Sequence, residues 1–109
     1  MPNHYRYGRK AEEKVARQLR GHGASVSLSP PSRGPTDLVA SFPAGTEWGV
    51  QVKSTRHGLP ASPSPRELAN LRRSATRAGR TAVLADVTPD GTEYRSARTG
   101  RRLNPPKRR

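Results

Sequence analysis

Apolar residues recur at helical spacing in two parts of the chain. The first stripe consists of Ala11, Val15, Ala16 and Leu19, and it predicts a helix over residues 8–22. Glycines follow directly after this stripe and supply a stop signal. A helix is therefore expected to open the folded domain.

The second helix carries clear start and stop signals. Ser64 is the predicted N-cap, Pro65 takes the first helical position, and Glu67 completes a capping box. The buried stripe then comprises Leu68, Leu71, Ala75 and Ala78. Gly79 is expected to end the helix.

Elsewhere the pattern changes to the alternation of polar and apolar residues that is typical of strands. It predicts strands over residues 24–29, 36–42, 48–54, 81–87 and 92–97. A Pro-Ala-Gly-Thr segment joins the second and third strands into a hairpin. The apolar fourth strand is expected to be central and the fifth to lie at an edge. The order α-β-β-β-α-β-β predicts an α/β fold with a central mixed sheet flanked by helices.

The chain has 109 residues, which is enough for one domain. We place this domain at residues 1–97. From Arg98 onward, six of twelve residues are Lys or Arg, so residues 98–109 are predicted to be a basic, disordered tail. Only 30% of all residues are apolar. The core is therefore expected to be thin, and association of two copies would help to stabilise it.

The charge of the chain favours a polyanionic partner. Twenty-one Lys and Arg residues face eight Asp and Glu residues, for a net charge of +13. Nucleic acid is the leading candidate, because no amphipathic segment with bulky apolar anchors favours a membrane surface. The absence of cysteine excludes thiolate metal sites and disulfides. No signal peptide or membrane span is visible, so a cytoplasmic protein is expected.

The predicted hairpin brings together three side chains with complementary chemistry. If its turn centres on Ala44, residue 37 lies opposite residue 51. Gln51 and Lys53 are two apart on a strand and share a face, so Asp37 would stand beside both. Mg²⁺ prefers oxygen ligands, which the Asp37 carboxylate, the Gln51 amide and the Val52 backbone carbonyl can provide. Lys53 could orient a water or stabilise a phosphoryl transition state.

Three motifs of this chain resemble those of the PD-(D/E)XK nuclease superfamily. They are Gly8-Arg9-Lys10-Ala11-Glu12 before a helix, SRGPTDLVA at 32–40, and VQVKS at 50–54. Over about residues 5–87 the chain looks most like archaeal-type Holliday junction resolvases. The resemblance implies a restriction-endonuclease-like fold and a homodimer that cleaves DNA in recombination and repair, associated with the nucleoid. It also implies Mg²⁺ as the cofactor, for which Mn²⁺ can substitute.

The resemblance also implies a role for each matching residue. Glu12, Asp37 and Gln51 would bind the metal, and Lys53 would act on the water. Ser32 would lie near the scissile phosphate, with Ser29 as the second choice. Two positions depart from the family pattern, because Thr36 separates Pro35 from Asp37 and because Gln51 stands where the family has Glu. The loss of a negative charge at Gln51 should lower metal affinity and leaves a binding-only protein open.

Substrate choice is not determined by these residues. A restriction or repair nuclease acting on duplex DNA remains an alternative to junction resolution, and an RNA-binding protein with a basic tail is a third, weaker hypothesis. The residues predicted to contact DNA phosphates are Arg6, Arg9, Lys10, Arg33, Arg56, Arg72 and Arg73.

Overall fold

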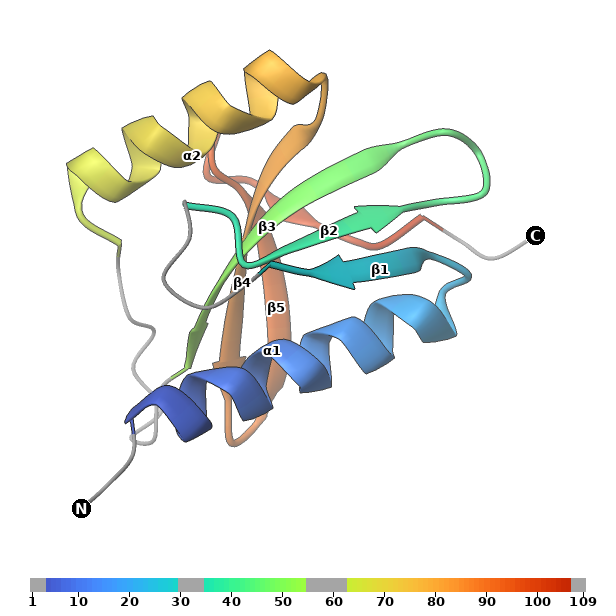
Figure 1. The fold of residues 1–109 in the computed structure, drawn as a ribbon, viewed down its shortest axis with the longest axis vertical. Coiled ribbons are helices and arrows are strands. Elements are labelled where there is room, and N and C mark those ends of the chain that lie inside the picture. The colour runs from blue at the N-terminus through green and yellow to red at the C-terminus, as the bar shows by residue number, and fades with distance from the viewer. Residues whose placement is uncertain (1–3, 30–34, 55–62, 107–109) are drawn as a thin grey trace.

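The computed structural model describes the chain over residues 4–29, 35–54 and 63–106, with side chains from Lys10 onward in the first helix. Its elements, in chain order, are α1 (His4–Gly21), β1 (Ser25–Leu28), β2 (Leu38–Ser41), β3 (Glu47–Ser54), α2 (Pro65–Ala78), β4 (Thr81–Thr88), β5 (Gly91–Ser96) and β6 (Arg102–Leu103). Figure 1 shows the twisted sheet with α1 crossing in front of its lower part and α2 lying at the top of the view. The predicted α/β architecture is therefore confirmed.

The six strands form one mixed sheet in the order β1-β2-β3-β4-β5-β6. Only β3 and β4 are parallel, and α2 is the crossover that connects them. Parallel neighbours require such a crossover, whereas tight turns are enough for antiparallel neighbours. The predicted central position of the fourth strand is confirmed, because β4 lies between β3 and β5.

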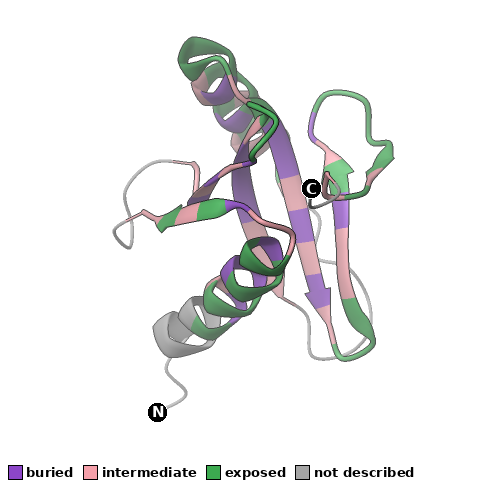
Figure 2. Cartoon of the chain, turned by 90° about the vertical axis from the view of Figure 1, so that its right-hand side faces the viewer, coloured by how far each residue is buried: buried purple, intermediate pink, exposed green. Residues whose placement is uncertain are grey.

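The two helices bury different faces of this sheet. Val15 and Leu19 of α1 are fully buried in a cluster with Leu38, Val50 and Val83 of the strands. Leu71 and Ala75 of α2 form a second cluster with Ala82 and Ala97, against which Leu84 packs. Successive strand residues point to opposite faces, so the odd and even positions of β4 serve different helices. Figure 2 shows buried and partly buried residues alternating along β4.

The predicted capping of α2 is confirmed in detail. The Glu67 backbone N–H donates to Ser64 Oγ at 3.1 Å, and the Ser64 backbone N–H donates to Glu67 Oε1 at 3.1 Å. Pro65 occupies the first turn, and Gly79 ends the helix with a left-handed φ of 71°. Both ends of α2 are therefore defined by the local sequence.

The end of the chain differs from the prediction of a disordered tail after Ala97. Residues 102–103 form β6, which pairs with β5 through Tyr94 and Arg95. The turn before β6 is held by Ser96, whose Oγ accepts the backbone N–H groups of Arg98 and Thr99. Leu103 packs against the main core. The prediction was therefore wrong for residues 98–106, and β5 is not the edge strand of the sheet.

None of the helices in the described ranges has both the length and the apolar character needed to cross a membrane.

Candidate active site

The candidate site begins where the chain enters β2. The β2–β3 register pairs Leu38 with Val50, as the predicted turn at Ala44 requires. At Asp37 the ladder ends, and its backbone N–H donates to the Val50 carbonyl at 2.8 Å. Its carboxylate Oδ2 accepts the Val52 backbone N–H at 2.7 Å. Asp37 therefore contacts β3 on both sides of Gln51.

Gln51 is the buried polar residue of this region. Its side chain is 8% exposed, and its Oε1 atom has no hydrogen-bond partner among the described residues. Its neighbours Val50 and Val52 pack in or against the α1 cluster, so Gln51 faces the α2 side of the sheet. An unsatisfied buried carbonyl costs about 1–3 kcal/mol, so this atom is poised to accept a ligand.

Lys53 lies on the same face of β3, two residues after Gln51. Its Nζ is 2.8 Å from Oε2 of Glu67 in the first turn of α2. The other oxygen of Glu67 is held by the capping box. The lysine ammonium is thus fixed by a side chain that is itself fixed by the start of the helix.

The Asp37 carboxylate sits in a partly desolvated environment with mixed charge. Burial raises the pKa of Asp37 above its ordinary value, while the hydrogen bond from Val52 and the charge of Lys53 act to lower it, and the charge of Glu67 acts to raise it. These effects place Asp37, Lys53 and Glu67 in one electrostatic neighbourhood. A buried carboxylate whose charge is only partly balanced favours the approach of a cation.

The residues present fit a hard divalent cation. Asp37 offers a carboxylate and Gln51 an unpartnered amide oxygen, and Mg²⁺ is often held by one or two carboxylates while it keeps several waters. The described part of the chain contains no cluster of three His, Cys, Asp or Glu side chains. A site that used Asp37 and Gln51 would not form such a cluster, because its second oxygen donor is an amide.

The predicted second carboxylate, Glu12, lies on α1. This helix packs on the face of the sheet opposite to that of Gln51 and Lys53. Glu12 is half-buried and follows Ala11, which belongs to the α1 core cluster. Its role as a metal ligand stays a prediction.

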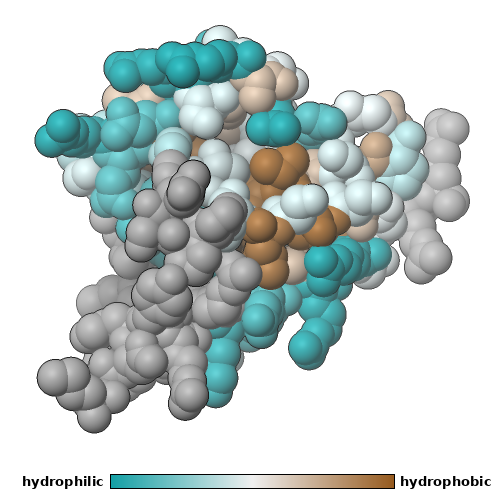
Figure 3. All heavy atoms as spheres, in the orientation of Figure 1, coloured by the Kyte–Doolittle hydropathy of each residue, from teal (hydrophilic) through white to brown (hydrophobic). Residues whose placement is uncertain are grey.

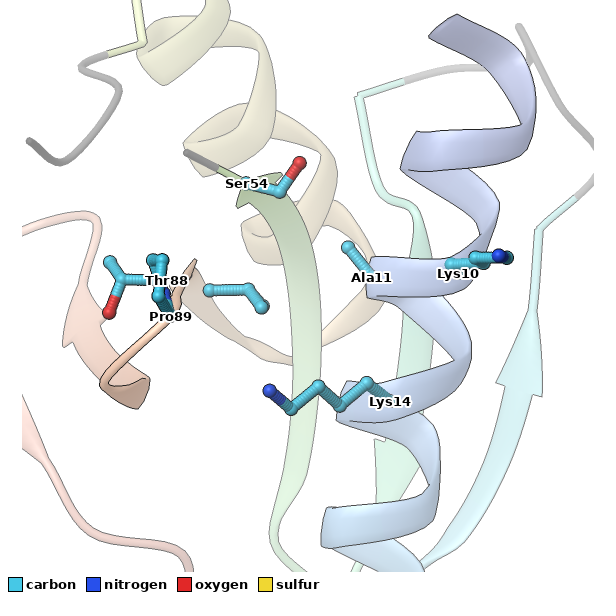
Figure 4. A pocket seen from close by; sticks show the side chains of 7 residues that line it. Lys10, Ala11, Lys14, Ser54, Thr88 and Pro89 are labelled. Carbon is cyan, nitrogen blue, oxygen red and sulfur yellow. The ribbon is translucent and has the colours of Figure 1, made fainter. Parts of the chain in front are cut away.

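A pocket of about 460 Å³ opens beside Ala11, at the ends of β3 and β4. Ser54, which directly follows Lys53, and Thr88 also line it. Figure 4 shows Lys14 extending across this pocket, whereas the ammonium of Lys10 points away from it. Lys10, a predicted DNA contact, is exposed.

Several predicted site residues lie outside the described structure. They are Ser32, Arg33 and Arg56, together with the side chains of Arg6 and Arg9. Ser29, the second choice for the phosphate-proximal serine, is described: its backbone N–H donates to the Asp37 carbonyl at 2.8 Å. This bond ties the end of β1 to the candidate site.

The two arginines predicted on α2 are part of a larger basic groove. Arg72, Arg73 and Arg77 line a shallow groove with Thr76 and with Arg98 from the β5–β6 turn. Arg72 Nε donates to the Ala97 carbonyl at 2.7 Å, which fixes that guanidinium. Within the described ranges, none of these four arginines forms an ion pair with a carboxylate. Figure 3 shows hydrophilic side chains gathered along α2.

Glu67 is the site residue that the sequence analysis assigned only to helix capping. Its second contact, with Lys53, joins positions 14 residues apart and depends on how α2 packs across the sheet. The available signal was an acidic residue in the first turn of the helix that follows Lys53. Spacing alone could not distinguish a capping residue from a residue that also reaches the site.

Comparisons with known proteins bear on the fold. No protein-family model matches the sequence, and no curated protein matches it. Among solved structures, the chain is similar to Hjc of Archaeoglobus fulgidus, a Holliday junction resolvase from an archaeal hyperthermophile. The TM-score is 0.71 at 23% sequence identity, and the match covers 80% of this chain and 73% of that chain. The resemblance to archaeal resolvases is therefore confirmed at the level of the fold: this chain shares its α/β architecture with a Holliday junction resolvase.

Proposed function

We propose that this protein is a Mg²⁺-dependent endonuclease that hydrolyses DNA phosphodiester bonds and resolves four-way junctions. One observation carries the proposal. Asp37, the unpartnered oxygen of Gln51 and the ammonium of Lys53 gather on one sheet face, in a fold similar to that of a junction resolvase. The net charge of +13 supports a nucleic-acid substrate. With DNA as its partner, the protein would be associated with the nucleoid.

The oxygen atoms of Asp37 and Gln51 would hold the cation, with the Val52 carbonyl and Glu12 as further predicted ligands. When bound, a divalent cation lowers the pKa of water and neutralises charge that builds up on the phosphate, and Mn²⁺ can substitute for Mg²⁺. Asp37 retains its position through the bond to the Val52 N–H. The ligand oxygens are therefore preorganised by the backbone of β3.

Lys53 would act on the phosphate and on the attacking water. Its ammonium is held at 2.8 Å from Glu67, so its side chain is already ordered before the substrate binds. A positioned cation at a developing negative charge stabilises the transition state without reorganisation during the reaction. Ser32 would contact the scissile phosphate in the same step.

Junction resolution requires two cuts, so we propose a homodimer with one site in each copy. A second chain would also supplement the thin apolar core. The Hjc structure belongs to a protein described as a Holliday junction resolvase, which supports a branched substrate. A nuclease acting on ordinary duplex DNA would use the same site residues, Glu12, Asp37, Gln51 and Lys53. It would differ only in how the two sites of a dimer are arranged.

An Asp37→Asn variant tests the proposal. Asn retains an oxygen to accept the Val52 N–H but removes the charge, so cleavage of a labelled junction in Mg²⁺ should fall at least a hundredfold while junction binding is retained. Asp90→Asn, in the exposed turn between β4 and β5, is the matched control and should cut like the wild type. Undiminished cleavage by Asp37→Asn would remove Asp37 from the site.

Gln51 favours a second candidate, a DNA-binding module with little or no catalytic activity on the same fold. A neutral amide replaces a carboxylate at this position, and metal affinity should be correspondingly lower. Gln51→Glu discriminates between the two functions. A large gain in cleavage over an almost inactive wild type would indicate the binding module, whereas a loss from an active wild type would indicate a nuclease adapted to Gln51.

A further inference from the structure

The candidate site lacks one negative charge on the Gln51–Lys53 strand. On the α2 face, Glu67 is ion-paired with Lys53 and acts on Asp37, whereas Asp86, the partner of Lys53 in the β3–β4 ladder, is influenced by Arg95 and Glu93 of β5. Gln51 contributes an oxygen but no charge. A divalent cation is bound more tightly when a second carboxylate balances its charge. The nearest acidic side chain to Lys53 therefore merits a role beyond capping.

The two carboxylate oxygens of Glu67 make different contacts in the structure. Oε1 accepts the Ser64 backbone N–H as part of the capping box, while Oε2 lies 2.8 Å from Lys53 Nζ. A capping box accepts Gln as readily as Glu. Capping therefore needs only one oxygen of this residue, and the negative charge is directed toward Lys53.

The surroundings of Glu67 also suit a cation. Its side chain is 41% exposed, so an ion can approach it from solvent. Its negative charge acts to raise the pKa of Asp37. The unpartnered oxygen of Gln51, a side chain more than nine-tenths buried, faces the same side of the sheet and is an independent sign that a ligand binds there.

We propose that Glu67 is an acidic ligand of the metal site beside Asp37 and supplies, from α2, the charge that Gln51 does not supply from β3. This inference rests on the proposed function, because it assumes that a divalent cation binds at Asp37 and Gln51. In the structure, the Lys53 ammonium forms an ion pair with the Glu67 carboxylate. In the presence of a bound cation, Glu67 would supply one carboxylate oxygen to it, and the Lys53 ammonium would be available to the phosphate.

Mn²⁺ binding to the full-length protein, followed by the electron paramagnetic resonance signal of free Mn²⁺, tests this proposal without any cleavage assay. Glu67→Gln keeps the capping box but removes the charge, and it should weaken Mn²⁺ binding at least tenfold. Glu47→Gln is a closely matched control, since Glu47 is also 41% exposed and also paired, with Arg80 at 3.2 Å. It should bind Mn²⁺ like the wild type.

A charge relocation makes the test sharper. If the charge of Glu67 stands in for the one absent at Gln51, adding Gln51→Glu to Glu67→Gln should restore most of the lost Mn²⁺ affinity. Unchanged binding by Glu67→Gln, or no restoration in the double variant, would overturn the proposal and leave Glu67 as the residue that positions Lys53. Urea unfolding without metal should give similar stabilities for Glu67→Gln and the wild type, which shows that the helix is intact.

The two proposals can fail separately. A wild type that binds Mn²⁺ through Glu67 but cuts no DNA would reject the nuclease function and keep the ligand assignment. A wild type that cuts DNA, with a Glu67→Gln variant of unchanged Mn²⁺ affinity, would do the reverse. A wild type that binds no Mn²⁺ would reject both.

Discussion

The position of Asp37 disfavours its ionised form in the folded protein and suits the binding of a cation. Its carboxylate is partly buried, and burial raises its pKa. One hydrogen bond from Val52 and the charge of Lys53 offset this effect only in part. A group in this position stabilises the folded protein less when it is ionised than when it is neutral.

The pKa of Asp37 makes the pH dependence of stability predictable. Because the folded pKa is raised above 3.8, the folded state binds more protons than the unfolded state between these two values, so the free energy of unfolding falls as the pH rises through that window. Asp37→Asn removes this loss. Without metal, we expect the variant to be at least as stable as the wild type at pH 7 in urea unfolding, with the difference shrinking as the pH falls below 3.8.

Bound metal should reverse this order of stabilities, so that the wild type becomes more stable than Asp37→Asn. A ligand that binds only the folded state stabilises it by about 2.7 kcal/mol when the ligand concentration is a hundred times the Kd. The free energy of unfolding of the wild type should rise accordingly. Asp37→Asn should gain much less from Mg²⁺ or Mn²⁺ in the same unfolding assay. A variant that is clearly less stable than the wild type without metal at pH 7 would show instead that the carboxylate is structural.

At the scale of single residues, sequence predicted the grouping of Asp37, Gln51 and Lys53 because strand periodicity and turn position determine which side chains face one another. It did not predict that Asp37 leaves the ladder and binds the Val52 N–H. Nor did it predict the contact between Glu67 and Lys53, which depends on the angle at which α2 crosses the sheet. Contacts between distant elements carry no local signal in one sequence.

Among the elements, α2 has the strongest local definition and the closest link to the site. Its first turn holds Glu67, and Glu67 holds Lys53. Leu71, fully buried, anchors the same helix on the sheet. The start of this helix is therefore a structural support for the candidate site as well as a helix terminus.

Removal of the N-cap tests that link. Ser64→Ala loses the acceptor for the Glu67 backbone N–H, and we expect a loss of about 1 kcal/mol in the free energy of unfolding measured in urea. The freed first turn should also weaken Mn²⁺ binding, because Glu67 is less well positioned. Ser74→Ala, within the same helix and away from its cap, is the control. Equal stabilities of the wild type and Ser64→Ala would contradict a structural role for the capping box.

Element prediction was most successful where a short-range rule applied. The cap of α2, the turn between β2 and β3 and the apolar run of β4 all follow from neighbouring residues. The segment after Ala97 was misjudged because its charge concealed a turn. Ser96 and Gly100 build that turn, and Leu103 supplies the one apolar contact that β6 makes with the core cluster.

At the scale of the whole molecule, a group of four arginines lies on the same side of the sheet as the candidate site. The basic groove of Arg72, Arg73, Arg77 and Arg98 flanks α2, whose first turn carries Glu67. Ten residues separate Glu67 from Arg77, or about 15 Å along the helix. That length corresponds to about four base-pair steps of duplex DNA. In the proposed nuclease, this groove would bind a DNA arm several base pairs from the site of cleavage.

Salt dependence of binding tests this placement. Each arginine that contacts a phosphate contributes about one to the slope of log K against log salt concentration. We expect Arg73→Gln with Arg77→Gln to reduce the slope for junction binding by about two and to weaken binding at physiological salt. Arg102→Gln, whose guanidinium lies 3.8 Å from Glu93, is the control. A slope unchanged in the double variant would place the DNA on another surface.

Overall architecture was predictable because element order and one apolar face per element restrict the possible sheets to a few. The homodimer, which the resemblance to resolvases implies, stays a prediction. Substrate preference depends on that same arrangement.

The proposed nuclease activity is best tested by cleavage of a labelled four-way junction and its matched linear duplex, with Mg²⁺ or Mn²⁺ and with chelator. We expect paired, symmetric nicks in the junction that chelator abolishes, and little cutting of the duplex. Equal cutting of both substrates would contradict the junction specificity. Tight junction binding without cleavage under either metal would contradict the nuclease itself.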